Sequence, residues 1–144
     1  MFRAAVIYAP AALEAVAERI SASLDRKRFQ VSVKPAEQAS VPDLAAADLV
    51  LLGSSAQGRA ALPAEFAEIL RALSGINLAG RVGGVFAAGS DVPLAAWKEA
   101  LKDSGILLQP ENLLRSDGAD PKALSAWVAG LARQVENLAR GHGD

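Results

Sequence analysis

The residues best able to do chemistry gather in two short polar loops of an otherwise apolar chain. Their hydroxyl, amide, guanidinium and carboxylate groups can hydrogen-bond a small polar ligand. The first loop holds Ser54, Ser55, Ala56, Gln57, Gly58 and Arg59, and the second holds Gly89, Ser90 and Asp91. Polar loop residues of these types also bond their own backbone, and we favour that structural role over ligand binding.

Several kinds of chemistry are excluded by what the chain lacks. It has no cysteine and one histidine, His142, near its C-terminal end. This composition excludes disulfides, thiolate metal sites, histidine metal clusters and Ser-His catalytic triads. Residues 84–90 have the glycine spacing of a phosphate-binding loop but lack its lysine. We therefore predict no metal site and no catalytic residue, and the sequence does not identify an enzyme.

Charge and hydropathy narrow the class of partner. The 144 residues include 15 basic and 16 acidic side chains, giving a formal net charge of −1. Proteins that bind nucleic acids or membrane surfaces carry a basic excess, so neither partner is expected. The N-terminal apolar run at residues 1–8 is too short for a signal peptide or a membrane span, which predicts a cytoplasmic protein.

The elements that must position the two loops alternate between strand and helix. An uncharged run at residues 49–53, preceded by Asp48, is typical of a strand buried on both faces. Apolar residues spaced three and four apart predict helices between the strands. Strands are predicted at residues 3–8, 29–33, 48–53, 81–88 and 106–108, the last resuming at 113–114, and helices begin near residues 10, 40, 63, 94 and 121.

Two pairs of residues on these elements admit a second role besides a structural one: ligand binding for the first pair and an interface for the second. Gly83 and Gly84 interrupt the fourth strand, and we expect them to let a helix approach it closely. Trp97 and Trp127 lie on apolar helical faces, where core packing is expected first and an interface second.

This alternation predicts an α/β fold: a three-layer, doubly wound sheet of five parallel strands in the order 2-1-3-4-5. A single domain spans residues 1–140, and residues 141–144 form a frayed tail. Ligands of such sheets bind beyond the carboxyl ends of the strands, at the switch point between strands one and three. The loops at residues 9–12, 54–61 and 89–93 therefore face the candidate site.

Three stretches of the sequence resemble short-chain flavodoxins. They are residues 48–54 (DLVLLGS), 62–66 (LPAEF) and 78–86 (LAGRVGGVF), and the resemblance runs from residue 3 to about residue 138. It implies the flavodoxin-like fold and electron transfer by FMN. It also implies that the FMN phosphate is bound after the first strand, and that aromatic residues of the other two loops stack on the isoalloxazine ring.

The cofactor loops depart from this family pattern. The loop after the first strand is Ala9, Pro10, Ala11 and Ala12, with no hydroxyl group and no glycine. A phosphate dianion needs hydroxyl and backbone donors at a helix N-terminus, and proline removes one backbone donor. The other two loops contain no aromatic residue. We therefore predict a degenerate FMN site, no cofactor, and a role as a binding or interaction module for a protein partner.

Two alternative functions remain open at this stage. An FMN-binding electron-transfer flavodoxin could hold its cofactor through loop backbone amides together with Ser54, Ser55 and Arg59. A flavin-dependent oxidoreductase of the same fold could complete its site with residues of a partner chain. The sequence leaves monomer and homodimer equally open.

Overall fold

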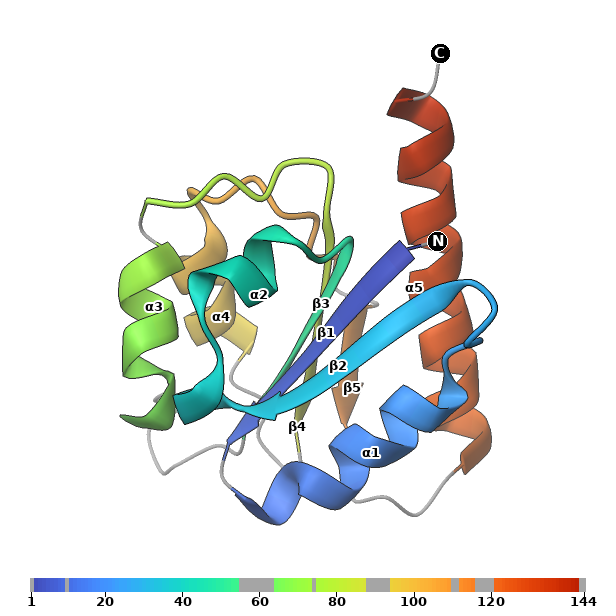
Figure 1. Cartoon of the computed structure of the whole chain (residues 1–144), viewed down its shortest axis with the longest axis horizontal. Coiled ribbons are helices and arrows are strands. Elements are labelled where there is room, and N and C mark those ends of the chain that lie inside the picture. The colour runs from blue at the N-terminus through green and yellow to red at the C-terminus, as the bar shows by residue number, and fades with distance from the viewer. Residues whose placement is uncertain are drawn as a thin grey trace.

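The computed structural model describes residues 2–9, 11–54, 64–73, 75–87, 94–109, 112–115 and 121–142. Its centre is one sheet of five parallel strands in the order β2-β1-β3-β4-β5, as predicted (Figure 1). The strands are β1 (Phe2–Ala9), β2 (Phe29–Pro35), β3 (Leu49–Ser54), β4 (Val82–Ala87) and β5 (Leu113–Arg115).

Helices cover both faces of this sheet. They are α1 (Glu14–Ser23), α2 (Val41–Ala45), α3 (Ala67–Leu73), α4 (Leu94–Leu101) and α5 (Pro121–His142). α1 and α5 pack on one face, and α2, α3 and α4 lie on the other (Figure 1). None of the helices in the described ranges is both long enough and apolar enough to cross a membrane.

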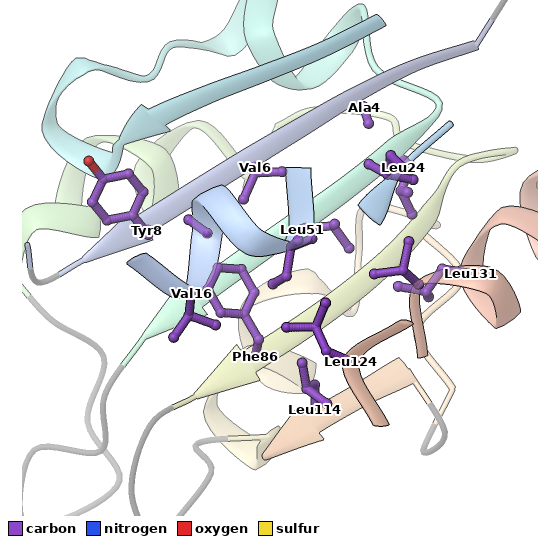
Figure 2. Close-up of a cluster of buried hydrophobic side chains, with 14 of the residues drawn as sticks. Ala4, Val6, Tyr8, Val16, Leu24, Leu51, Phe86, Leu114, Leu124 and Leu131 are labelled. Carbon is purple, nitrogen blue, oxygen red and sulfur yellow. The ribbon is translucent and has the colours of Figure 1, made fainter. Parts of the chain in front are cut away.

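Each face of the sheet has its own apolar core because successive side chains of a strand point to opposite faces. Ala4, Val6 and Tyr8 of β1 point toward α1 and α5 (Figure 2). Ala5 and Ile7 of the same strand join the core under α2, α3 and α4. Every residue of β3 is buried, which confirms the prediction drawn from its uncharged sequence.

Gly84 brings α5 against the sheet. A Cβ atom at this position would lie 2.7 Å from Leu51 Cδ2 and 3.1 Å from Trp127 Cζ2. Only a residue without a side chain allows that approach, so the expected role of this glycine is confirmed. Gly83 was expected to admit a helix as well, but it leaves space for Ile106 of the segment after α4, whose Cδ1 would lie 3.0 Å from an added Cβ.

The fifth strand lies later in the chain than predicted. Residues 106–108 contribute only an isolated bridge between Leu107 and Val82, and β5 begins at Leu113. Asn112 explains the position of β5, because its side-chain amide donates to the Gly83 carbonyl at 2.7 Å and to Gln134 Oε1 at 3.0 Å. These two bonds tie the entrance of β5 to β4 and α5. Helix α5 also continues to His142, past residue 141, where the tail was expected to begin.

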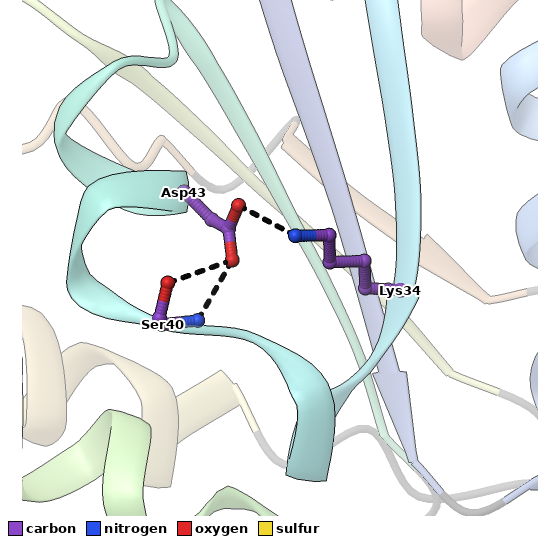
Figure 3. Close-up of polar contacts among 3 residues, drawn as sticks. All are labelled: Lys34, Ser40 and Asp43. Atoms are coloured by element: carbon purple, nitrogen blue, oxygen red, sulfur yellow. Dashed lines mark hydrogen bonds and ion pairs between the residues drawn. The ribbon is translucent and has the colours of Figure 1, made fainter.

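The start of α2 is fixed to the edge strand by a small polar network. Asp43 Oδ2 accepts hydrogen bonds from the Ser40 backbone amide at 2.8 Å and from its hydroxyl at 3.1 Å (Figure 3). Asp43 Oδ1 pairs with Lys34 Nζ at 2.9 Å. This capping box, followed by Pro42 in the first turn, confirms the helix start predicted at Ser40.

Candidate functional site

The carboxyl ends of β1, β3 and β4 meet at one edge of the sheet, where the sequence places the candidate site. Ala9 lies opposite Ser54, and Gly53 lies opposite Phe86. Of the predicted site residues, the structure describes Ala9, Ala11, Ala12 and Ser54. Pro10, Ser55, Ala56, Gln57, Gly58, Arg59, Gly89, Ser90 and Asp91 lie outside the described residues, so their part in the site stays a prediction.

Ser54 is held inside the protein. Its side chain has no exposed surface, and its hydroxyl oxygen accepts a hydrogen bond from the Trp97 indole N–H at 3.1 Å. Trp97 is itself fully buried and packs edge-on against Phe66, with ring centroids 4.9 Å apart. The expected core role of Trp97 is confirmed. Its indole uses the Ser54 hydroxyl as an acceptor, which leaves this serine a structural task at the end of β3.

The neighbouring Gly53 is required by the packing of β4. A Cβ atom at position 53 would overlap the ring of Phe86, which crosses over it. Phe86 is fully buried in the core beneath α1 and α5. The half of the edge formed by β3 and β4 is therefore packed tightly in the part that the structure describes.

The turn between β1 and α1 is short and apolar. β1 ends at Ala9, a 3-10 turn spans Ala11–Leu13, and α1 begins directly after it. Ala11 and Ala12 are exposed, whereas Leu13 is buried in the core. Their side chains provide no hydroxyl and no positive charge. The first charged group of this turn is Glu14, the first residue of α1.

A cavity of about 380 Å³ lies beside this turn, at the carboxyl ends of β1 and β2. Among the described residues that line it are three glutamates and no lysine, arginine or histidine. The lining residues are Tyr8, Ala9, Ala11, Glu14, Pro35, Ala36, Glu37, Gln38 and Glu65. Sequence reasoning missed this cluster because its acids come from three separate segments, and no local spacing pattern links them.

The pKa of Tyr8 reflects its burial and the charges around this cavity. Its side chain is 6% exposed, and Figure 2 shows its hydroxyl directed away from the apolar cluster around its ring. Burial raises the pKa of Tyr8, and the charges of Glu14, Glu18 and Glu37 raise it further. A hydrogen bond with Glu14 acts in the same direction. The three carboxylates that line the cavity act against an additional negative charge there.

These residues can be tested against the flavin that binds at the switch point of such a sheet. A phosphate monoester needs converging donors or cations at a helix N-terminus. The described part of the β1–α1 turn offers neither side-chain donors nor cations, and carboxylates stand beside it. The described side chains of this turn therefore provide no contact that would hold a phosphate. The described residues also contain no group of three or more histidine, cysteine, aspartate or glutamate side chains that could hold a metal ion.

Comparison with known proteins gives matches to structures alone. No protein-family model matches the sequence, and a search of curated proteins found no match. A short-chain flavodoxin associated with a non-canonical PDU bacterial microcompartment is 24% identical, with a TM-score of 0.79 over 94% of this chain and 99% of that one. Flavodoxin 2 from Bacillus cereus, in its oxidised form, is 26% identical, with a TM-score of 0.78 over 92% and 99%.

A third match connects this fold with a cofactor. The flavodoxin of Fusobacterium nucleatum, described as bound to flavin mononucleotide, is 14% identical, with a TM-score of 0.71 over 93% of this chain and 99% of that one. Together the matches confirm the flavodoxin-like fold that the sequence predicts. They do not support the expectation that this chain lacks a cofactor, because its structural neighbours are flavodoxins.

Proposed function

We propose that this chain binds a flavin at the carboxyl edge of its sheet and acts as an electron carrier. The observation that supports this proposal is the almost end-to-end match to flavodoxins, including one that is 26% identical over 92% of the chain. A flavin supplies the electron-transfer chemistry through its ring system, so the protein has to hold and orient that ring. The loops at residues 9–12, 54–61 and 89–93, which the sequence predicts to face this edge, would hold the ring.

Flavin titration of the purified, flavin-free protein tests this proposal. We expect quenching of flavin fluorescence that saturates with a Kd near 1 µM or below, which corresponds to about 8 kcal/mol of binding free energy. The reduction potential of the bound flavin should also differ from that of free flavin, since an electron carrier needs a protein-tuned potential. Unchanged fluorescence of both riboflavin and FMN at tens of micromolar protein would overturn the proposal.

A second candidate is the cofactor-free binding module. The observation that favours it is the β1–α1 turn, which has no side-chain donor and lies beside the acidic cavity. This candidate predicts a protein that purifies without colour and binds neither flavin. The same titration therefore separates the two functions.

A further inference from the structure

We infer that the carboxyl edge discriminates against the phosphate of its ligand, so that the flavin is recognised without a phosphate group. The inference rests on the proposed function and specifies its ligand class: a flavin with an uncharged ribityl chain, such as riboflavin, in preference to the phosphate monoester. Three related features of the β1–β2 half of the edge support it.

The first feature is the start of α1. In a doubly wound sheet the helix N-terminus after a strand is the natural place for an anion, because its backbone N–H groups point outward and the helix dipole is positive there. Here Glu14 is the first residue of α1, and Glu18 lies one turn later. The carboxylate of Glu14 offsets the positive end of the dipole at the position where a phosphate would need it.

The second feature is the charge of the adjoining cavity. Glu14 from α1, Glu37 from the segment after β2 and Glu65 from the segment before α3 all line it. Lys34 lies near the end of β2, two residues before the segment that holds Glu37, but its Nζ is paired with Asp43 at 2.9 Å (Figure 3). The nearest lysine along the chain is therefore engaged on a carboxylate of the scaffold.

The third feature is Tyr8, which extends from the end of β1 into the same cavity. The side chain is almost fully buried, and its phenolate form is disfavoured first by burial and further by the acids around it. The carboxylates that line this cavity would also repel the dianion of a phosphate monoester. An uncharged hydroxyl-bearing chain meets no such repulsion.

The test compares riboflavin with FMN in the same fluorescence titration, at low and at high salt. We expect riboflavin to bind at least as tightly as FMN. The affinity for FMN should rise with salt, because salt screens a repulsion, whereas the affinity for riboflavin should stay constant. A phosphate held by positive charges would respond to salt in the opposite direction.

Charge-removing variants locate the effect. Glu14→Gln and Glu37→Gln should each strengthen FMN binding by about two- to tenfold, the size expected when one like charge is removed at a solvent-exposed site. Neither variant should change riboflavin binding. Glu99→Gln is the matched control: it removes the same charge from an exposed position on α4, where Glu99 pairs with Lys102. The control should change neither affinity.

The possible outcomes distinguish this inference from the function on which it rests. If FMN binds at least tenfold more tightly than riboflavin and salt weakens it, the inference fails and the flavin-binding function stands. If the two glutamate variants change both flavins equally, the carboxylates do not discriminate and the inference fails as well. Failure of both flavins to bind would overturn the proposed function together with the inference.

Discussion

The two halves of the carboxyl edge are built from similar strands but differ in how their side chains are used. At β3 and β4, Gly53 accommodates the Phe86 ring and the Ser54 hydroxyl accepts the Trp97 indole N–H, all of it buried. At β1 and β2, an open cavity is lined by glutamates. The side chains at β3 and β4 stabilise the fold, whereas the polar groups at β1 and β2 face an open cavity and can contact a ligand.

Asp43, a carboxylate away from this edge, shows that the difference between the two halves does not come from residue type alone. Asp43 has both oxygens engaged, one by Lys34 and the other by Ser40. Burial raises the pKa of Asp43, but the hydrogen bonds from Lys34 and Ser40 outweigh that effect, so the pKa lies below its ordinary value. The glutamates of the cavity instead raise the pKa of a neighbour. An acid paired with donors stabilises the fold, whereas acids facing one cavity shape its potential.

The largest effect is expected where the edge is packed most tightly. Gly53→Ala would force its Cβ into the Phe86 ring and should lower the free energy of unfolding by about 3 kcal/mol, the upper part of the usual range for overpacking. Urea unfolding followed by circular dichroism measures this. Gly75→Ala is the control, because nothing lies within 4 Å of a Cβ added there. Equal stability of the two variants would show that the edge is not tightly packed at β3.

The next effect concerns the bond between β3 and α4. Ser54→Ala leaves the buried Trp97 indole N–H without its acceptor and should cost about 1–3 kcal/mol. In the background of Trp97→Phe, which removes the donor, the same serine substitution should cost clearly less. The double-mutant cycle from urea unfolding measures the difference. A serine effect of the same size in both backgrounds would place its cause outside this hydrogen bond.

A smaller effect, dependent on pH, separates Asp43 from the cavity glutamates. Its lowered pKa means that the folded state holds the ionised form more strongly than the unfolded state does. The resulting stabilisation is present above the unfolded pKa of about 3.8 and is lost as the pH falls through the lower folded value. Asp43→Asn should cost about 1 kcal/mol at pH 7, from the loss of the charge that strengthens its hydrogen bonds to Ser40 and its partly exposed ion pair with Lys34.

Unfolding midpoints measured between pH 3 and pH 7 test this difference. The loss of stability from Asp43→Asn should shrink toward acid pH and approach zero where the native aspartate is protonated. The opposite trend, with a loss that grows as the pH falls, would contradict the assigned role of this carboxylate.

The fold could be predicted because its signals are local. The uncharged β3 sequence and the apolar spacing along α5 each lie within one segment, and strand order then follows from general rules of doubly wound sheets. The position of β5 could not be predicted in this way, since it depends on the long-range hydrogen bonds from Asn112 to Gly83 and Gln134. An apolar run at residues 106–108 was the stronger local signal, yet tertiary contacts placed the strand later.

The site was harder to predict for the same physical reason. The absence of hydroxyl groups after β1 is visible in the sequence, because Ala11 and Ala12 are adjacent to the strand end. The bond between Ser54 and Trp97 joins residues 43 positions apart. The acidic cavity likewise forms only when three segments converge. A list of loop residues could therefore identify missing donors but could not reveal which groups face one another.

The smallest expected effect is also the most direct test of the acidic half of the edge. Tyr8 is the single tyrosine of the chain, so absorbance at 295 nm during a pH titration follows it alone. Its pKa should lie above the ordinary 10.0, and Glu37→Gln should lower it without restoring that value, because burial is the larger cause and remains. Since the folded state holds this proton more tightly, stability should fall as the pH rises from about 10 through the raised pKa.

Glu99→Gln, which removes a charge from α4, should leave the titration unchanged. A tyrosine that titrates identically in wild type and Glu37→Gln would show that solvent screens the cavity acids from one another, and the contrast between the two halves of the edge would then be one of packing alone.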